Sequence, residues 1–262
     1  MNKNTIIFAE ERSQDIIELI NRNGKVTVAE LSKRYGVSLP TIRTDLAELE
    51  KLGLLRRTHG GAIPASTRAS FELTSAEKEI RNVDQKKAIA KEAYKLINRG
   101  DVIALDTGTT TRELALLLAD TRDITVITND IKIAAILENN ENINLTLIGG
   151  TVRRGFHCTL GPTTKTQFSD LYADKAFIAA NAISLKRGLS TPNVEVADIK
   201  TQIIKNSRQN IALIDSSKFE GEALYKFADI KDMDVIISDE EVPAAFATAI
   251  KKAGCKLIKA KQ

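Results

Sequence analysis

From residue 102 onward, short apolar runs alternate with helical segments, and this alternation constrains the fold more than any other feature of the chain. The runs predicted to be strands are 102–106, 124–128, 145–148, 175–180, 211–215, 235–238 and 256–258. Strands that alternate with helices form a mainly parallel sheet with both faces covered. We therefore expect an α/β domain over residues 83–262.

A different pattern occupies residues 8–62, where short helical segments are separated by glycine-containing turns. Thr27 and Glu30 have the spacing of a capping box and predict the start of one helix. Ser38 as the N-cap, with Pro40 in the first turn, predicts the start of the next. Two short helices joined in this way are typical of a helix-turn-helix.

The second of these helices, predicted over 39–52, has two distinct faces. At about 100° per residue, Ile42, Leu46 and Leu49 share one stripe, which we expect to face the core. The opposite face is small, polar or basic, which suits a helix that enters a DNA major groove, although an ordinary surface helix has the same pattern. The candidate DNA-contacting residues here are Ser38, Thr41, Arg43 and Thr44.

Residues 53–62 contain paired arginines and a Gly-Gly sequence, which predict a short β-hairpin, or wing. We expect Arg56 and Arg57 to contact DNA phosphates or to enter the minor groove. His59 is expected to form hydrogen bonds in the wing and is a further candidate DNA-contacting residue. Gly60-Gly61 permits the positive φ angles of a tight hairpin turn. The whole segment, 8–62, is therefore predicted to be a winged helix-turn-helix.

Residues 63–82 are polar and contain Pro, Ser and Thr, and we interpret them as an interdomain linker that becomes helical towards Asp84. A chain of 262 residues also favours two domains over one. The net charge of +4 does not by itself argue for nucleic-acid binding. The aromatic content of 5% argues against a surface that stacks on single-stranded bases.

The composition also excludes several classes of protein. No apolar run reaches the roughly 18–20 residues that span a bilayer, and the N-terminal segment lacks the apolar core of a signal peptide. Cys158 and Cys255, together with His59 and His157, have no metal-ligand spacing. We therefore expect a cytoplasmic protein with reduced thiols, no metal site and no cofactor.

Polar residues follow several of the predicted strands, and parallel sheets bind ligands at the carboxyl ends of their strands. The loop 108–111 combines a glycine, hydroxyl groups and a helix N-terminus, which suits a phosphate. It lacks the Gly-Lys-Ser/Thr of a Walker loop, so nucleotide hydrolysis is not expected. Each residue alone is equally a capping or turn residue, but together they favour a ligand site. The candidates are Asp106, Gly108, Thr109, Thr110, Thr111, Asn129, Gly149, Gly150, Arg153, Asp215 and Lys218.

Motifs along nearly the whole chain resemble the DeoR family of bacterial transcription regulators. In the first domain they are Val26–Ser32, Gly36–Ser38, Thr41–Leu46, Leu49–Glu50 and Arg57–Ala62. In the second domain they are Asp106–Thr111, Val126–Asn129, Ile148–Gly150, Gly188–Thr191 and Asp215–Phe219. The resemblance implies a DNA-binding regulator, with family precedent for repression of carbohydrate-utilisation operons. It also implies an effector domain similar in fold to ribose-5-phosphate isomerase and CoA-transferase sheets.

The resemblance further implies an effector that is a phosphorylated sugar or sugar alcohol. Phosphate contacts are implied for Gly108–Thr111 and Lys218, and polyol contacts for Asp106, Asn129, Asp215 and Arg153. A two-fold operator requires at least a dimer, so the expected partners are double-stranded operator DNA, the effector and further copies in a homodimer or homotetramer.

Two positions depart from the family pattern. Thr44 stands where the family usually has Arg, so operator contacts are expected to differ there. Val196 stands where members often have Glu, which puts an effector contact through that position in doubt.

An enzyme is the alternative interpretation, namely a sugar-phosphate isomerase joined to a DNA-binding domain, because a fold alone does not define a function. Proton abstraction next to a carbonyl needs a positioned general base. Asp106, Asp130 and Asp215 are available, but no spacing singles one out. We favour a regulator that is not an enzyme.

Overall fold

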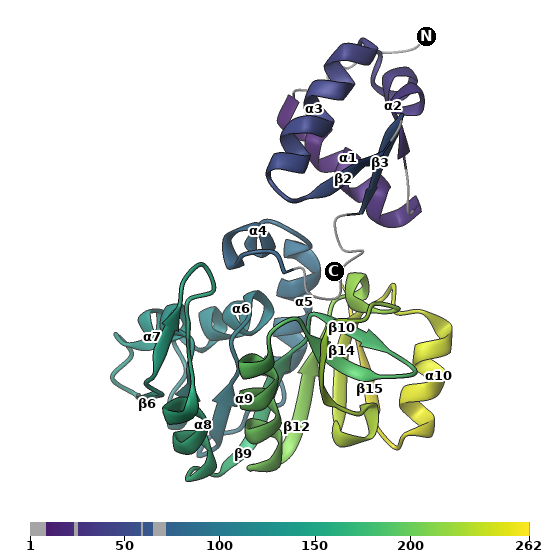
Figure 1. Cartoon of the computed structure of the whole chain (residues 1–262). Helices are drawn as coiled ribbons and strands as arrows, with labels where there is room; N and C mark the ends of the chain where they lie inside the picture. The colour runs from purple at the N-terminus through teal and green to yellow at the C-terminus, as the bar shows by residue number, and fades with distance from the viewer. Residues whose placement is uncertain (1–8, 24–25, 59, 65–71, 262) are drawn as a thin grey trace. The chain divides into compact units, whose positions relative to one another are not determined.

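The computed structural model describes residues 9–23, 26–58, 60–64 and 72–261, which divide into two compact units between Leu73 and Thr74. Each unit has buried apolar clusters of its own, and each is described separately below. Figure 1 labels the helices and strands.

The first unit contains three helices and a three-stranded antiparallel sheet of order β1-β3-β2. Its elements are α1 (Ala9–Asn23), β1 (Val26–Thr27), α2 (Val28–Tyr35), α3 (Leu39–Lys51), β2 (Leu55–Thr58) and β3 (Gly61–Pro64). The predicted capping box of Thr27 and Glu30 is present, and Ser38 caps α3 as expected. Gly36, in the left-handed conformation, ends α2. The helix-turn-helix and its wing are therefore confirmed.

The core of the first unit lies where the sequence placed it. Ile42, Leu46 and Leu49 are all buried against α1 and the wing strands. Only one of the two glycines in the Gly-Gly sequence has the positive φ angle that was predicted for both. Gly60 has a φ of 94°, but the φ of Gly61 lies outside the left-handed region. Gly61 is needed for another reason, because a Cβ there would lie 2.0 Å from the carbonyl oxygen of Val26 on β1.

The second unit is built on a seven-stranded sheet of order β15-β14-β12-β9-β4-β5-β6, in which every neighbouring pair is parallel. Its strands are β4 (Val102–Leu105), β5 (Ile124–Thr128), β6 (Ile143–Leu147), β9 (Ala173–Ala179), β12 (Ser207–Leu213), β14 (Val235–Asp239) and β15 (Lys256–Ala260). All seven strands were predicted. The expected α/β class with a mainly parallel sheet is confirmed.

Helices cover both faces of this sheet, as the alternation predicted. The helices of the second unit are α4 (Ser75–Glu79), α5 (Val83–Tyr94), α6 (Thr109–Leu118), α7 (Ile131–Leu137), α8 (Pro162–Ser169), α9 (Val194–Lys205) and α10 (Ala244–Lys252), with short 3-10 turns η2 (Ser216–Lys218) and η3 (Ile230–Asp232), and all of them except α4 and the turns lie against the sheet. Two small antiparallel sheets, β7-β8 and β10-β11-β13, were not predicted. Their strands are β7 (Thr151–Arg153), β8 (Cys158–Leu160), β10 (Ala182–Ser184), β11 (Gly188–Thr191) and β13 (Tyr225–Ala228).

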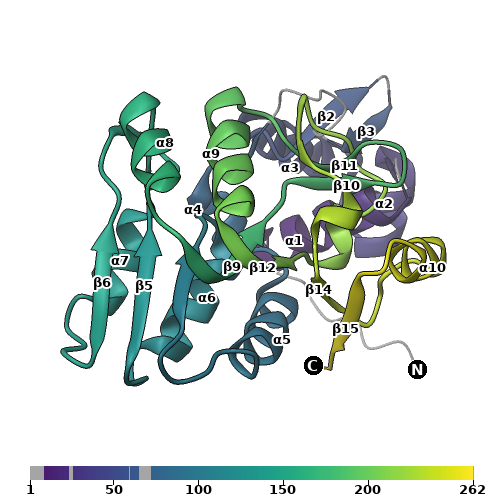
Figure 2. The same cartoon turned by 90° about the horizontal axis from the view of Figure 1, so that it is seen from below.

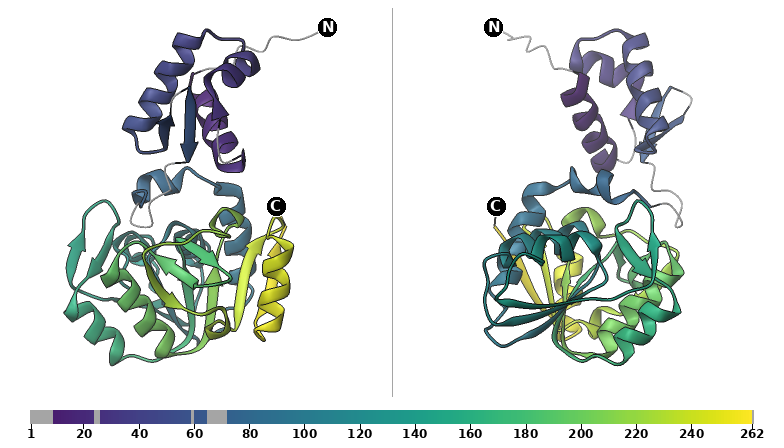
Figure 3. Two further views of the ribbon diagram at one scale, coloured as in Figure 1. Left: turned by 45° about the vertical axis from the view of Figure 1, so that its right-hand side comes forward. Right: turned by 90° about the vertical axis from the view of Figure 1, so that its left-hand side faces the viewer.

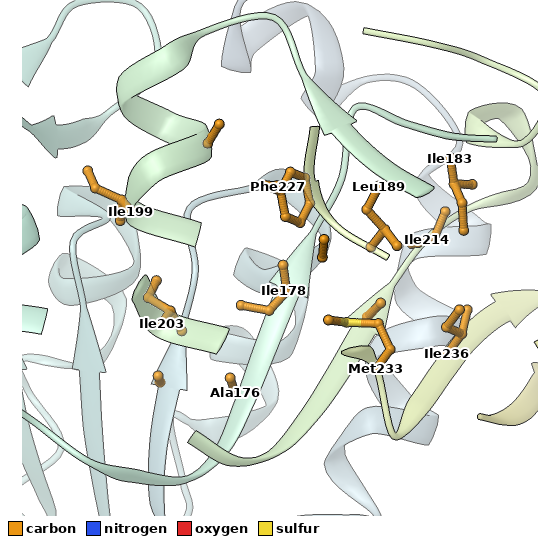
Figure 4. Close-up of a cluster of buried hydrophobic side chains, with 14 of the residues drawn as sticks. Ala176, Ile178, Ile183, Leu189, Ile199, Ile203, Ile214, Phe227, Met233 and Ile236 are labelled. Atoms are coloured by element: carbon orange, nitrogen blue, oxygen red, sulfur yellow. The ribbon is translucent and has the colours of Figure 1, made fainter. Parts of the chain in front are cut away.

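Successive strand residues point to opposite faces of the sheet, and this produces two separate cores. On one face, Ile103 and Leu105 of β4 are buried with α5, α6 and α7. On the other face, Ala104 belongs to a cluster with α8, α9, α10 and the sheet β10-β11-β13. Figure 2 shows α8 and α9 on the opposite side of the sheet from α5 and α6, and Figure 3 gives two further views of these layers. Figure 4 shows part of the second cluster, where Phe227 lies near Ile178 and Leu189.

The strand order reverses between β4 and β9. From β4 the chain continues to β5 and β6 on one side, whereas β9, β12, β14 and β15 lie in sequence on the other. Ligands of doubly wound sheets bind outside the carboxyl ends of the strands at such a switch point. The topology therefore predicts a ligand site at the residues that follow β4 and β9.

Within the described residues, no helix is long and apolar enough to cross a membrane. The same residues contain no group of three His, Cys, Asp or Glu side chains that could hold a metal ion.

Candidate DNA-binding and ligand-binding sites

The start of α3 displays the candidate DNA-contacting residues. The Ser38 hydroxyl oxygen accepts a hydrogen bond from the Thr41 backbone N–H at 3.2 Å and lies 2.8 Å from the Thr41 hydroxyl. The Thr44 hydroxyl donates to the Pro40 carbonyl oxygen at 3.2 Å. Arg43 and Thr44 are exposed. The helix thus presents one guanidinium among small hydroxyl groups.

A buried ion pair, which sequence reasoning missed, fixes α3 against α1. Arg12 donates from Nε to Asp45 Oδ2 at 2.7 Å and from a terminal nitrogen to Oδ1 at 3.0 Å. Both residues are 7% exposed. The hydrogen bonds from Arg12 to Asp45 raise the pKa of Arg12, and burial opposes this shift. Because Asp45 faces inward, its carboxylate does not oppose DNA phosphates at the exposed face of α3.

The wing carries the paired arginines at consecutive positions of β2, so their side chains point to opposite faces of the strand. Arg56 and Arg57 are both exposed, and their strand pairs with β3 in the register Arg56↔Ile63. The backbone N–H of Arg57 donates to Glu50 Oε1 at 2.7 Å, which ties the wing to the end of α3. His59, also predicted to contact DNA, lies outside the described residues.

In the second unit, Asp106 lies at the switch point between β4 and β9. It is 1% exposed, and its Oδ2 accepts hydrogen bonds from the Ala179 backbone N–H at 3.0 Å and from Lys200 Nζ. Its Oδ1 is buried with no hydrogen-bond partner in the described part of the chain. Burial raises the pKa of Asp106, and the Lys200 charge opposes this shift. Sequence reasoning missed Lys200, which lies on α9, 94 residues after Asp106 in the chain.

Asn129 lies at the same level, after the neighbouring strand β5, because Leu105 pairs with Thr128. Its Nδ2 donates to the Thr159 carbonyl oxygen at 2.8 Å. Its Oδ1 is buried and, among the residues described, has no donor. Buried acceptors without a donor are rare and cost about 1–3 kcal/mol each. Two such acceptors lie at adjacent strand ends here, and Asn210 and Ser238 carry two more in the same unit.

The loop 108–111 opens α6 beside Asp106. Thr109, Thr110 and Thr111 are buried, and no side chain of the described residues caps this helix. The first backbone N–H groups of a helix have no partner within it, so this end suits an anion. A Cβ on Gly108 would lie 2.8 Å from the Ala179 Cβ, which explains why glycine is required where the loop passes the end of β9.

Asp130 acts as a helix cap. Its Oδ1 accepts from the backbone N–H groups of Lys132 at 2.9 Å and Ile133 at 3.1 Å. Its Oδ2 accepts from the Thr107 hydroxyl at 2.8 Å, and burial raises its pKa. The sequence left a capping role open for every polar residue that follows a strand. For Asp130, the hydrogen bonds support that role.

Gly149 and Gly150, two further candidates, contact α8. The Gly149 N–H donates to Gln167 Oε1 at 3.2 Å, and its carbonyl oxygen accepts from the Thr164 hydroxyl at 2.7 Å. A Cβ on Gly150 would lie 2.0 Å from the Thr164 hydroxyl oxygen. Arg153 places its guanidinium carbon 3.6 Å from the centre of the Phe156 ring. The structure thus gives the glycines a packing role and gives Arg153 an aromatic partner.

Asp215 and Lys218 lie together after β12. Asp215 is 2% exposed and accepts hydrogen bonds from Asn82 Nδ2 at 2.9 Å and from the Ser217 N–H at 3.2 Å. Lys218 Nζ lies 3.8 Å from Asp215 Oδ2. Burial opposes ionisation of Asp215, but Lys218, Ser217, Lys86 and Asn82 together lower its pKa. This carboxylate is therefore charged and holds Lys218 at the edge of the sheet.

Residues 74–82, which we call the strap, cross this edge of the second unit. The strap falls inside the expected linker, yet it contains α4 and contacts several strand-end loops. The Ser75 N–H donates to the Gly155 carbonyl oxygen at 2.9 Å, and Lys78 Nζ lies 5.5 Å from the centre of the Phe156 ring. A capping box of Thr74 and Glu77 begins α4, and this sequence signal could have predicted the helix.

Two charged contacts hold the rest of the strap. Glu79 Oε1 accepts hydrogen bonds from Arg112 on α6 and from Lys132 Nζ on α7, the latter at 3.0 Å. These contacts, led by Arg112, lower the pKa of Glu79 to about 2. Lys86 Nζ donates to the carbonyl oxygens of Lys78 and Arg81, the latter at 2.6 Å. Burial lowers the pKa of Lys86 to about 8.

Of the two cysteines, Cys158 pairs through an isolated backbone bridge with Asp130, next to the candidate residue Asn129. Cys158 on β8 and Cys255 before β15 are both free thiols and both buried. Burial raises the pKa of each to about 11, so both thiols are protonated at neutral pH.

These two sites define a class: a DNA-binding transcription regulator with a ligand-sensing domain. Comparisons with known proteins agree. Residues 12–68 match the DeoR-like helix-turn-helix domain, and residues 81–240 match the DeoR C terminal sensor domain. The chain belongs to the DeoR family of transcriptional regulators.

Relatives match along nearly the whole chain. A putative aga operon transcriptional repressor of Escherichia coli O157:H7 is 37% identical over 249 residues, 95% of this chain and 93% of that protein. The transcriptional regulator GlpR of Haloferax volcanii is 34% identical over 95% of this chain and 96% of its own length. The transcriptional repressor GlcR of Bacillus subtilis is 30% identical over 98% of both chains.

Among solved structures, ribose 5-phosphate isomerase A of Methanocaldococcus jannaschii overlaps 53% of this chain and 55% of its own, with a TM-score of 0.40 and 22% identity. We draw no functional argument from a likeness of this size.

Proposed function

We propose that the protein is a repressor of a carbohydrate-utilisation operon and that a phosphorylated sugar or sugar alcohol relieves the repression. Two of its relatives bear the name of repressor, one of them for the aga operon. The observation that carries the effector half of the proposal is the pair of buried acceptors, Asp106 Oδ1 and Asn129 Oδ1, which lack donors among the described residues. Ligand hydroxyl groups would supply those donors.

The operator is bound by α3 and the wing. The small hydroxyl residues and the guanidinium at the start of α3 reach base edges and phosphates in the major groove, and the wing arginines contact the phosphate backbone. The proposed contacts are Ser38, Thr41, Arg43, Thr44, Arg56 and Arg57, with His59 in the same wing. Because operators of this kind have two half-sites, the acting form is at least a homodimer.

The effector is bound at the carboxyl ends of β4, β5 and β12. Its phosphate group lies at the loop 108–111 and near Lys218, which Asp215 holds in place. Its hydroxyl groups donate to Asp106 and Asn129. By linkage, an effector that weakens operator binding is itself bound more weakly by the operator complex, and by the same factor.

The effector is bound but not converted. An aspartate acts as a general base only if one of its oxygens is free to reach the substrate proton. Asp130 is committed to capping α7, and Asp215 is committed to the turn η2 and to Lys218. Asp106 retains one free oxygen, but Lys200 holds the other. These commitments favour a sensor over an isomerase.

The test is operator binding measured by gel shift with DNA from the promoter regions beside the gene, against a panel of sugar phosphates. At least one sugar phosphate is expected to weaken DNA binding by wild-type protein. Lys218→Ala is expected to bind DNA as wild type does but to lose the response, because the phosphate loses its ammonium partner. Lys186→Ala, which removes an exposed lysine between β10 and β11, is the control. If no compound in the panel changes the DNA affinity of the wild-type protein, the sensing proposal is wrong.

A further inference from the structure

The strap crosses the edge of the sheet where the effector is proposed to bind. It bonds to the β7-β8 hairpin through Ser75 and to the turn after β12 through Asn82. Between these ends, Glu79 bonds to Arg112 and Lys132, each in the first turn of the helix that follows β4 or β5. Asp106 and Asn129, two of the residues with unpartnered buried oxygens in the described chain, directly follow the same two strands.

We propose that Arg112 and Lys132 form the cationic part of an anion subsite, that the Glu79 carboxylate occupies this subsite in the ligand-free protein, and that the phosphate group of a bound ligand displaces Glu79. The proposal rests on the proposed function and adds the residues that detect the phosphate.

The chemistry of the contact supports an exchange of anions. A guanidinium and an ammonium group donate hydrogen bonds to carboxylate and to phosphate oxygens alike, so the donors that hold Glu79 also suit a phosphate monoester. The phosphate carries a charge of roughly −1.5 to −2 at pH 7 and competes well with a single carboxylate. The Arg112 side chain is 15% exposed and that of Glu79 25%, so solvent screens the contact weakly while an entering anion still reaches it.

The position of the strap in the sequence explains how displacement of Glu79 by phosphate would affect the connection between the two units. The strap begins at Thr74, directly after the last residue of the first unit. Displacing Glu79 removes one of the two charged contacts in the middle of the strap and leaves Lys86, Ser75 and Asn82 to hold the rest. The occupancy of the anion subsite is thereby transmitted to the segment of chain that joins the two units.

The experiment uses full-length protein and inorganic phosphate as the probe. Phosphate affinity is measured by calorimetry at fixed ionic strength, and hydrogen exchange of the amides of residues 74–82 reports release of the strap. In wild-type protein, saturating phosphate is expected to speed this exchange. Glu79→Gln is expected to exchange rapidly without phosphate and to bind phosphate roughly tenfold more tightly, because the internal competitor has gone. Glu138→Gln, the same change at an exposed position at the end of α7, is expected to behave as wild type.

Arg112→Gln separates the proposal from a purely structural ion pair. It is also expected to release the strap, but to lose phosphate binding by at least about tenfold, the opposite of Glu79→Gln. A structural ion pair would give both variants the same phosphate affinity. Equal affinities, or no phosphate binding by either wild type or Glu79→Gln, would overturn the subsite. If a sugar phosphate nevertheless weakens operator binding by wild type, the proposed function stands without the strap mechanism.

Discussion

At the scale of single residues, the DNA-binding surface depends on which charges are turned inward. Asp45 lies on the same helix as Arg43, but it is buried and paired with Arg12. The exposed charge near the start of α3 is therefore the guanidinium of Arg43. The Thr44 hydroxyl donates a hydrogen bond to the Pro40 carbonyl oxygen. Because Thr44 carries no charge, we expect more of the electrostatic attraction to DNA to come from the wing arginines.

The contribution of the wing can be measured through salt dependence. Arg57→Ala is expected to weaken operator binding and to reduce the slope of log affinity against log salt concentration by about one, because one phosphate contact and its released counterions are lost. Lys259→Ala, which removes an exposed lysine from β15, is expected to leave the slope unchanged. An unaltered slope for Arg57→Ala would mean that this residue makes no phosphate contact.

At the scale of elements, the strap is the part of the fold that the sequence described least well. The segment is polar and contains only the short helix α4, so no apolar periodicity marks it as part of a domain. It is held in place by Arg112, Lys132, Lys86 and Asp215, which are distant in sequence. Long-range polar contacts of this kind leave no signal in a local pattern.

The anchoring of the strap is expected to depend on pH. The pKa of Glu79 is lowered from 4.5 to about 2, so its stabilising contribution is complete above about pH 4.5 and is lost as the pH falls towards 2. The full shift corresponds to about 3 kcal/mol, and partial solvent exposure of Glu79 and Lys132 reduces this, so over that window the free energy of unfolding of wild-type protein should fall by about 2 kcal/mol more than that of Glu79→Gln. Urea unfolding at a series of pH values measures the difference. Parallel curves for the two proteins would show that the ion pair contributes nothing to stability.

At the scale of the whole molecule, the two units have separate cores. The cluster around Ile42 and Leu46 belongs to the first unit, whereas the clusters on the two faces of the large sheet belong to the second. A ligand stabilises the cooperative unit to which it binds. The effector is therefore expected to raise the unfolding temperature of the second unit, and the operator that of the first unit.

Calorimetric unfolding tests this expectation. A sugar phosphate at about 100 times its Kd should raise the melting temperature of the second unit by roughly 5–10 °C and leave that of the first unit unchanged. Operator DNA should raise the transition of the first unit. A single transition that moves with either ligand would show that the units unfold together.

Much of this architecture could be predicted from the sequence, because periodicity and caps are local. All seven strands of the large sheet and the caps at Thr27 and Ser38 were predicted in this way. The partners of the site residues could not be predicted. Lys200 reaches Asp106 only because α9 folds back over the switch point, and Arg12 meets Asp45 only across two helices. The strands of the small sheet β10-β11-β13 are short; β10 and β11 are buried throughout and β13 only in its second half, so none of them shows a clear alternation.

The burial of both cysteines has a practical consequence for spectroscopy. Because Cys158 and Cys255 are covered and protonated at neutral pH, maleimide dyes would react far faster with an exposed cysteine introduced by mutation. One dye on the strap and another on the wing could then be attached without first removing the natural thiols. Energy transfer between the two dyes would follow the connection between the units as phosphate is added.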